Sequence, residues 1–375
     1  MKLKLDEYKE QTKHKHEYLR EYLATWFNIL INYTTSSNMS YEKIIYVDSF
    51  SNAGEYITGE KGSPIIALNI FNDILKKDKN ENKKITVECY FNDYDKERKE
   101  HLKKIIENFE LDERIKIFYS QITANEHISC VMKKVVQYNN KKVLFFIDPY
   151  KIADDVISME SLNKILKDKD TEIIFNHMVN DVVRNIKHYP EKYQDFYRIN
   201  KTEQKNANEF NELFIENIRK ENDVRLFIFS YEFLNIKNQT IYFLVFITHH
   251  NKGFEKIKEA IWRVSKGDLI HKNKGNSNNC NLSLFPEENI KELKEFKIKN
   301  KVEDLKDILL NEFKGRNVKY EEIKKFVIEE TIFTSGQIYR KTLIPLKKEG
   351  KINIIGKIME TSDFIFLENS EEQNE

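Results

Sequence analysis

Asp148, Pro149 and Tyr150 form a short motif directly after the apolar segment "KVLFFI". A carboxylate held next to a proline can accept a hydrogen bond from an exocyclic amino group and keep the nitrogen lone pair aimed at an electrophilic methyl group. The adjacent tyrosine can stack on the base that carries the amino group. The motif therefore indicates amine methylation, although an ordinary Asp-Pro turn after a strand would contain the same residues. Lys151, which follows, either contacts a substrate phosphate or points into water.

Acidic and amide side chains also follow other apolar segments in this part of the chain. Asp48 follows the first segment, Asp93 the second and Gln121 the third. In an open parallel sheet, ligands bind beyond the carboxyl ends of the strands, where these side chains would lie. Asp93 suits the two hydroxyl groups of a ribose, so the pattern predicts a nucleotide-type cofactor. The alternative is that these residues lie in ordinary turns after the strands and bind no cofactor.

The loop after Asp48, "SFSNAG", is built mostly from small residues. Small side chains let the backbone approach a cofactor closely. Ser63 and Pro64 then suit the N-cap and the first turn of a helix. We expect the cofactor-binding residues of this region to be Phe50, Ser51, Gly54 and Ser63.

The elements that must position these residues alternate between strands and helices. Segments rich in β-branched and aromatic residues predict five strands: "KIIYVDSF", "ITVECYFND", "RIKIFYS", "KVLFFIDPY" and "TEIIFNH". Helical spacing fits the intervals near 64–77, 95–109, 124–137 and 156–167. This alternation predicts crossover connections and a doubly wound, Rossmann-like parallel α/β sheet. "VRLFIFSYEF" and "TIYFLVFITHH" are too close together for a crossover helix, so they predict an antiparallel last strand.

The chain divides into two predicted domains joined by a polar, low-complexity linker. The first opens with an amphipathic helix over residues 15–31 and contains a polar and aromatic segment that is either a substrate-facing insertion or a solvated loop. The second shows three helical patterns followed by two strand patterns, the order of a winged helix. The expected boundaries are 1–270 for the sheet domain with the insertion at 188–207, 271–300 for the linker, 301–368 for the winged-helix domain and 369–375 for a disordered acidic tail.

Composition excludes several classes of protein. The 375 residues include 62 Lys and Arg against 61 Asp and Glu, so any surface for nucleic acid must be local. No apolar run approaches the roughly 20 residues of a membrane span, and the amino-terminal segment lacks the apolar centre of a signal peptide. We therefore expect a cytoplasmic protein. Its cysteines, Cys89, Cys130 and Cys280, lack the spacing of a metal site or a disulfide framework, so no metal is expected.

Several motifs in this sequence recur in the same order in a known family. They are "KHEYLREYL", "YVDSFSNAGEY", "GSPIIAL", "DKER", the Asp-Pro-aromatic motif, "FNHMVNDVVRN" and "HHNKGFEKIKEAIW". On these motifs, which cover most of residues 13–265, the chain resembles the three-Cys-motif partner (TcmP) family of class I S-adenosylmethionine-dependent methyltransferases. The resemblance implies the class I methyltransferase fold, S-adenosylmethionine as cofactor and a winged-helix domain at the carboxyl end.

The resemblance also bears on individual residues. Lys15 and His16 should lie near the active site, an exposed charged helix start being the alternative. Where the family usually has Gly-Phe-Ala-Gly-Pro-Gly, residues 49–54 retain one glycine, and each lost glycine adds a Cβ near the methionine end of the cofactor. Gln121 replaces an aspartate that would contact adenine, and Lys151 replaces a glycine.

Two functions fit this sequence. Its Gly-Ser-Pro and Asp-Pro-aromatic elements are also similar to those of ribosomal RNA adenine N6-methyltransferases, which implies methyl transfer to a nucleobase amino group in RNA or DNA, with adenine N6 favoured. The alternative is a catalytically degenerate adaptor of the same fold that binds nucleic acid or a protein. Under either hypothesis, the family resemblance implies a protein partner that carries three cysteines and is encoded nearby.

The predicted third helix of the winged-helix domain carries a local group of basic residues. In helix-turn-helix modules, this helix enters the major groove while basic side chains contact phosphates. Nucleic acid is therefore the expected ligand, and protein contact is the alternative. The residues expected to contact it are Arg340, Lys341, Lys347 and Lys348.

Overall fold

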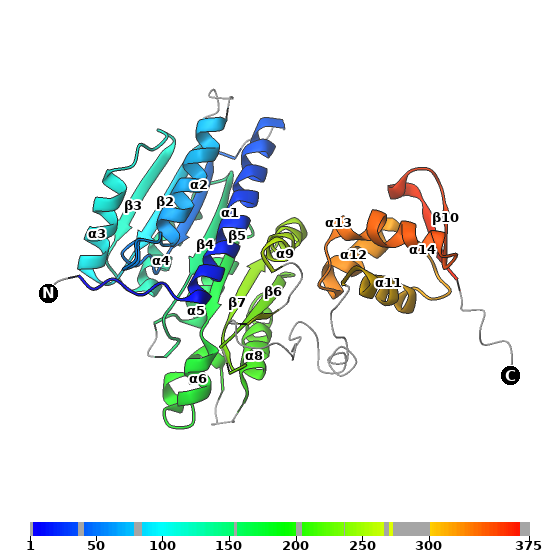
Figure 1. The fold of residues 1–375 in the computed structure, drawn as a ribbon. Coiled ribbons are helices and arrows are strands. Elements are labelled where there is room, and N and C mark those ends of the chain that lie inside the picture. Colours follow the sequence, from blue (N-terminus) through cyan, green and yellow to red (C-terminus); the bar gives the residue numbers. More distant parts are fainter. Residues whose placement is uncertain are drawn as a thin grey trace. The chain divides into compact units, whose positions relative to one another are not determined.

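The computed structural model describes residues 3–36, 41–78, 85–153, 156–199, 205–235, 237–265, 270–272 and 301–367. The chain forms two compact units (Figure 1). The first comprises residues 1–264 with 270–279, and the second comprises 265–269 with 280–375. Most of the predicted linker and the whole predicted acidic tail lie outside the described residues.

An eight-stranded sheet forms the centre of the first unit, with strand order β3-β2-β1-β4-β5-β7-β6-β8. Strands β1 to β5 run parallel, whereas β7 runs antiparallel to both β5 and β6. This order with a reversed β7 is that of the class I methyltransferase fold, so the predicted fold class is confirmed. The strands are β1 (Lys43–Asp48), β2 (Thr86–Asn92), β3 (Ile115–Ser120), β4 (Lys141–Ile147), β5 (Thr171–His177), β6 (Phe227–Leu234), β7 (Thr240–Thr248) and β8 (Ile270–Lys272).

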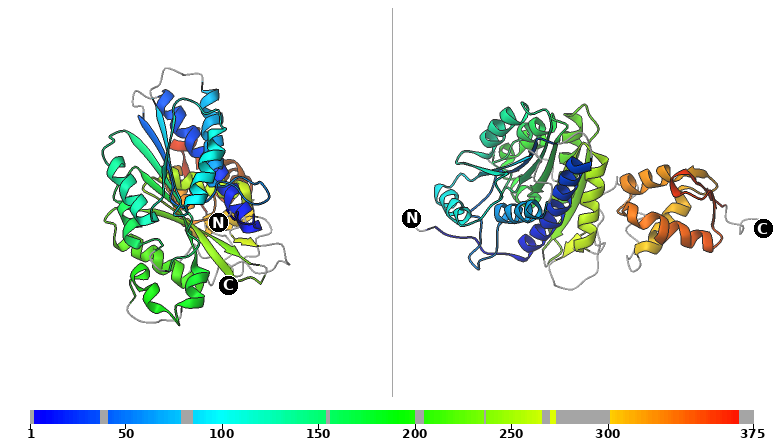
Figure 2. Two further views of the ribbon diagram at one scale, coloured as in Figure 1. Left: turned by 90° about the vertical axis from the view of Figure 1, so that its left-hand side faces the viewer. Right: turned by 90° about the horizontal axis from the view of Figure 1, so that it is seen from above.

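Helices cover both faces of this sheet, as Figure 2 shows from above. The first helix begins earlier and ends later than the sequence pattern predicted, and the three α-helices between β5 and β6 were not predicted. The helices are α1 (Glu10–Ser36), α2 (Ser63–Lys77), α3 (Lys96–Glu107), α4 (Ala124–Val135), α5 (Met159–Leu166), α6 (Val179–Asn185), the 3₁₀ turn η1 (Pro190–Lys192), α7 (Gln194–Tyr197), α8 (Ala207–Lys220) and α9 (Asn251–Ser265).

The alternation of side chains along β1 decides which face its last residue points to. Ile45 and Val47 belong to the core formed with α4 and α5. Tyr46 points the other way, toward Phe71 of α2, and Phe71 in turn contacts Phe27 of α1. Because strand side chains alternate with a period of two, Asp48 lies on the same face as Tyr46, the face covered by α1 and α2.

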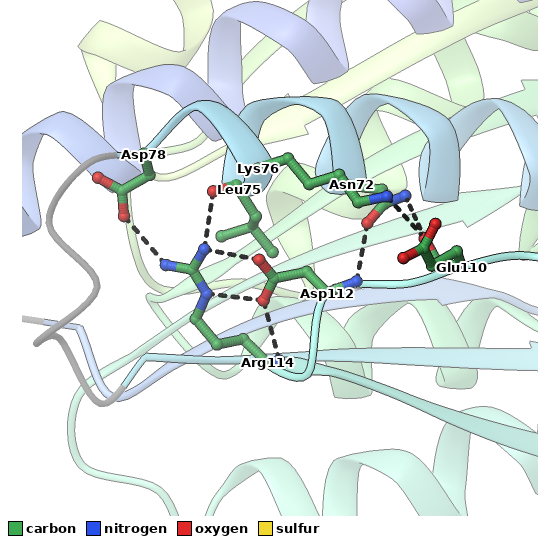
Figure 3. A network of polar contacts seen from close by, with 7 residues as sticks. All are labelled: Asn72, Leu75, Lys76, Asp78, Glu110, Asp112 and Arg114. Atoms are coloured by element: carbon green, nitrogen blue, oxygen red, sulfur yellow. Dashed lines mark hydrogen bonds and ion pairs between the residues drawn. The ribbon is translucent and has the colours of Figure 1, made fainter.

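A network of polar contacts fixes the last turn of α2 near the amino-terminal end of β3 (Figure 3). Arg114, at the start of β3, bonds to the carboxylates of Asp112 and Asp78 and donates to the Leu75 carbonyl at 2.8 Å. Hydrogen bonds and the charge of Arg114 hold the pKa of Asp112 below its usual range, although burial opposes this. The network ties the last turn of α2 to β3, so the first turn of α2 at Ser63 is held against the end of β1.

The predicted insertion at 188–207 packs onto the sheet domain where it is described. Tyr193, Phe196 and Tyr197 are buried, and the Tyr197 hydroxyl lies 2.7 Å from Nε2 of His177 at the end of β5. The solvated-loop interpretation is therefore wrong for these residues. The helix α8 that follows begins with a capping box between Asn206 and Glu209.

The second unit has the winged-helix architecture predicted for residues 301–368. Its third helix is continuous from Ser335 to Lys348 but contains a π-helical turn that ends two residues before Pro345, which has no N–H to donate to the preceding turn. A short strand, β9, joins the predicted hairpin to make a three-stranded sheet of order β10-β11-β9. The elements are α11 (Lys301–Glu312), β9 (Asn317–Lys319), α12 (Tyr320–Glu330), α13 (Ser335–Ile338), η2 (Tyr339–Leu343), α14 (Ile344–Lys348), β10 (Ile352–Ile355), η3 (Met359–Thr361) and β11 (Asp363–Phe366).

Buried apolar side chains from all three helices form the core of the second unit, and Phe364 and Phe366 of the hairpin complete it. In the described part of the whole chain, no helix is both long and apolar enough to cross a bilayer.

Candidate functional site

Strand register brings three polar side chains to one face at the carboxyl ends of β1, β4 and β5. Asp48 is the last residue of β1 and pairs with Phe146 of β4. Ile147 pairs with Phe175 of β5, so Asp148 lies beside Asn176. The Asp-Pro-Tyr motif and the loop after β1 therefore start from adjacent strands, as the parallel sheet predicted.

Both oxygens of the Asp148 carboxylate have partners in the protein. The Asn176 amide donates to Oδ1 at 2.6 Å, and the Lys15 ammonium of α1 forms an ion pair with Oδ2. Lys15 also lies 5.6 Å from the centre of the Tyr242 ring. Lys15 is therefore buried beside Asp148, so it is not part of an exposed charged helix start.

The rest of the motif contrasts a buried proline with an exposed ring. Pro149 is buried, whereas Tyr150 is 71% exposed. The Lys151 ammonium lies 5.7 Å from the centre of the Tyr150 ring. A flat ring that is open to solvent next to a carboxylate is available for stacking, and its lysine adds a positive charge at the same position.

Asp48 is fully buried and anchors the start of α2. Its carboxylate accepts hydrogen bonds from the Ser63 hydroxyl at 2.6 Å and from the Phe50 amide at 3.2 Å. Burial raises the pKa of Asp48 to about 7, although these two hydrogen bonds lower it in part. The prediction of Ser63 as the N-cap is wrong: Gly62 holds that position, because the Ser63 hydroxyl is directed to the stronger acceptor on β1.

The loop after β1 is held mainly by Asn92, the last residue of β2. The amide and the hydroxyl of Ser51 both donate to the Asn92 carbonyl, at 2.9 and 3.0 Å. The Asn92 side chain donates to the carbonyls of Ser49 and Ile122. Phe50 packs against the apolar core. Asn92 thus joins the loops that follow three strands.

Gly54 ends this loop with a backbone that only glycine adopts without strain. Its φ is +80°, and a Cβ there would lie 2.5 Å from Cδ1 of Leu102 in α3. A side chain at this position would force the buried Leu102 side chain to shift, in addition to straining the backbone. Asn52 also adopts a left-handed conformation, with φ of 53°, which asparagine tolerates better than most residues.

Asp93 and Gln121 follow the neighbouring strands β2 and β3. The Asp93 carboxylate is partly buried and accepts the Asp95 amide at 2.8 Å, and burial raises its pKa. Gln121 is exposed, and its amide oxygen lies 3.5 Å from the Lys99 ammonium. Both side chains therefore lie beyond the strands where a cofactor was expected, on the β2 and β3 side of Asp48.

The segment before α1 runs along the loop that follows β1. The Asp6 carboxylate accepts from the Asn52 amide at 2.7 Å, and its carbonyl accepts the Ile57 amide at 3.0 Å. His16 is buried, and its ring lies near the rings of Tyr8 and Tyr56. Burial, assisted by nearby Lys15, lowers the pKa of His16 to about 3, so this imidazole is neutral at pH 7.

Sequence reasoning missed some residues in this region. His127 of α4 is buried, and its Nδ1 lies 3.1 Å from the Ser49 hydroxyl. Asn92 is buried at a strand end next to the predicted Asp93. A polar residue inside a strand pattern was the available signal for Asn92, whereas His127 falls on the apolar face of its helix and gives no such signal.

The four basic residues predicted to contact nucleic acid are all exposed. Arg340 and Lys341 lie in the π-helical turn, and Lys347 and Lys348 lie at the end of α14. They come from one continuous helix, as the sequence predicted. In the described part of the chain, no cluster of three or more His, Cys, Asp or Glu side chains could hold a metal ion.

Comparisons with known proteins match one part of the chain to a family model. Residues 272–358 match the family model described as the GMT-like wHTH domain. No curated protein sequence matches the chain significantly. Among solved structures, LPL1258 from Legionella pneumophila str. Philadelphia 1 is 10% identical with a TM-score of 0.40, covering 68% of this chain and 92% of its own.

Two further solved structures are described as methyltransferases. A putative O-methyltransferase from Klebsiella pneumoniae is 13% identical, with a TM-score of 0.32 and coverage of 60% of this chain and 80% of its own. A putative rRNA methylase from Clostridium thermocellum is 9% identical, with a TM-score of 0.30 and coverage of 59% and 93%. The assignment of the fold rests on the strand order of the chain itself.

Proposed function

We propose that this protein is an S-adenosylmethionine-dependent methyltransferase that acts on a nucleobase amino group in RNA or DNA, with adenine N6 as the favoured acceptor. The observation that carries the proposal is the placement of Asp148 at the carboxyl edge beside β1 and its loop. An acceptor-orienting carboxylate and a candidate cofactor loop then meet on adjacent strands. The motif resemblance to the TcmP family supports the same function.

The residues around β1 and β2 fit such a cofactor. Asp93 would accept hydrogen bonds from the ribose hydroxyls, and the Gln121 amide would contact adenine. The small side chains at 51–53 would leave room for the methionine end. When bound, S-adenosylmethionine supplies an electrophilic methyl group.

Asp148 would orient the acceptor and handle its proton. Its carboxylate accepts a hydrogen bond from the amino group, which aims the nitrogen at the methyl group, and can receive the proton that the nitrogen releases after transfer. Tyr150 would stack on the base. Lys15 balances the charge of Asp148 until the acceptor arrives.

Calorimetry of S-adenosylmethionine and S-adenosylhomocysteine binding tests the cofactor assignment. We expect binding by the wild type and a loss of at least tenfold in Asp93→Ala, but no change in Asp223→Ala, an exposed aspartate in the turn before β6. Mass spectrometry of nucleosides after incubation with mixed RNA or DNA then identifies the product. No binding at millimolar ligand would refute the proposal.

One observation favours the adaptor as a second candidate. The protein itself engages both oxygens of Asp148, through Lys15 and Asn176. A decayed enzyme that keeps its fold could retain these contacts as purely structural ones. Under this alternative, the protein would bind nucleic acid or a protein partner but would not bind S-adenosylmethionine.

A further inference from the structure

The Asn176 side chain has one satisfied and one unsatisfied end. Its amide nitrogen donates to Oδ1 of Asp148 at 2.6 Å and lies 3.4 Å from the Met178 sulfur. Its amide oxygen is buried and has no hydrogen-bond partner in the described part of the chain. Buried side-chain acceptors in native proteins are almost always paired, so an unpaired one calls for an explanation.

The chemistry of Asp148 fixes the orientation of this amide. A carboxylate only accepts hydrogen bonds, so the NH₂ end of Asn176 must face it. A flipped amide would place its oxygen against Oδ1 of Asp148 and lose the bond. The unpaired oxygen is therefore a property of the site rather than of the choice between two equivalent amide orientations.

We propose that Oδ1 of Asn176 is a second acceptor for the amino group of the target base and so a specificity-determining contact. This inference rests on the proposed function. An exocyclic amino group has two N–H bonds, and Asp148 can accept only one of them in the base plane. Asn176 lies beside Asp148 at the end of the neighbouring strand, so it can accept the other.

Two acceptors at adjacent strand ends select an amino group over a carbonyl. An amino group satisfies both, whereas a base with a carbonyl at the same position would set a third acceptor against them. The base must displace the Lys15 ammonium from Oδ2 of Asp148 to enter. Entry therefore exchanges one donor to Asp148 for another, while Asn176 gains a donor that it lacks.

A series of bases in one oligonucleotide tests this contact without any variant. The probes are single-stranded oligothymidylates and oligouridylates that carry one adenine, purine or hypoxanthine, with binding to the full chain measured by fluorescence anisotropy in saturating S-adenosylhomocysteine. Backbone contacts, including those of the winged-helix unit, are common to the series and cancel in the ratio. We expect adenine to bind about 5- to 30-fold more tightly than purine, and hypoxanthine to bind most weakly.

Variants then assign the discrimination to Asn176. Asn176→Ser and Asn176→Ala should lower the adenine-to-purine ratio several-fold without abolishing it, because Asp148 still accepts one N–H of the amino group. The matched control is Asn211→Ser: Asn211 is also buried, but its oxygen and nitrogen are both bonded, to His177 and Ser230. This control should keep the wild-type ratio, which separates a direct contact from a general loss of packing.

Several results would overturn the inference. They are a wild-type ratio of one, no measurable binding of any probe, an undiminished ratio in Asn176→Ser, or an equal reduction of the ratio in Asn211→Ser. A different result would refute the proposed function. If the protein discriminates between adenine and purine but does not bind S-adenosylmethionine, the methyltransferase proposal is refuted and the Asn176 contact is retained. Methyl transfer by a wild type that does not discriminate would refute only the contact.

Discussion

Lys15 of α1 forms an ion pair with Asp148 at the end of β4, 133 residues away in the sequence. The two side chains are only 8% and 21% exposed, so solvent screens this pair little. The pair therefore links the second turn of α1 directly to the residue that would orient the acceptor. This link makes the amino-terminal helix part of the candidate site as well as part of the fold.

We expect Lys15→Ala to lower the free energy of unfolding of the first unit by about 2–3 kcal/mol, between the values for exposed and fully buried pairs. The cause is the Asp148 charge left largely uncompensated. Both tryptophans, Trp26 and Trp262, lie in this unit, so their fluorescence reports its unfolding in urea. Lys13→Ala, at an exposed position of the same helix, should change stability by less than about 0.5 kcal/mol. Equal effects of the two variants would contradict the importance of the pair.

Asp48 should make the first unit less stable as the pH rises. Its folded pKa of about 7 lies above its ordinary value of 3.8, chiefly because of burial, so the folded state holds a proton that the unfolded state releases in between. Stability from this group is therefore fully present below about pH 4 and is lost as the pH rises to about 7. The gap between the two pKa values corresponds to roughly 4 kcal/mol.

Asp48→Asn removes this titration, so its stability relative to the wild type should increase between pH 4.5 and 7.5. The quantity to measure is the difference in unfolding free energy between Asp48→Asn and the wild type. His16 is present in both proteins and changes stability with pH in the opposite direction, so its contribution cancels in this difference. Burial lowers the pKa of His16 to about 3, so its contribution is lost as the pH falls below about 6.5. A difference that stays constant over this pH range would show that Asp48 is not protonated in the folded state near pH 6.

Alanine variants of Gly54 and Gly59 distinguish the stability cost of a steric contact from the cost of backbone strain. Both have positive φ, +80° and +89°, but only a Cβ at Gly54 meets another atom, Leu102 Cδ1. Leu102 is buried and cannot move away freely. We expect Gly59→Ala to cost about 1 kcal/mol from backbone strain, and Gly54→Ala about 2–4 kcal/mol because overpacking adds to it. Urea unfolding measures both, and equal losses would exclude the close contact with α3.

The fold could be predicted because its signals are local. Each parallel strand is rich in β-branched and aromatic residues, and the connection between β6 and β7 is too short for a crossover helix, which predicts an antiparallel pair. The three residues of β8 carry no such pattern, since they only extend an existing sheet edge. Helix α8 did have a signal, with Phe210, Phe214 and Ile218 four residues apart, but its polar surroundings concealed it.

The site could be predicted only in part, because its contacts are long-range. Positions after strands were found from the sheet alone, which is why Asp48, Asp93 and Asp148 were selected. The partners of these residues depend on register and on helix placement, which no local pattern encodes. The ion pair of Lys15 and the bond from Asn176 to Asp148 required the structure, and the Ser63 hydroxyl bonds to β1 instead of capping its helix because Asp48 is within reach.

The winged-helix unit offers a test in which nucleic acid and protein binding give different results. Arg340 and Lys341 are exposed and adjacent on the helix that would enter a major groove. Each basic side chain that neutralises a duplex phosphate releases counterions, so removing one such side chain reduces the slope of log K against log salt concentration by about 0.9. We expect Arg340→Ala/Lys341→Ala to weaken binding of duplex DNA and to reduce this slope by about one to two.

A control with the same change in charge separates a specific surface from general electrostatics. Lys314 and Lys325 are also exposed, but they lie outside the third helix, after α11 and in α12. If nucleic acid binds along the third helix, Lys314→Ala/Lys325→Ala should leave the salt slope nearly unchanged, because these lysines bind no phosphate. Equal slopes in the two double variants would mean that the lysines act only through net charge, and an unchanged affinity in both would assign this unit to protein contacts instead.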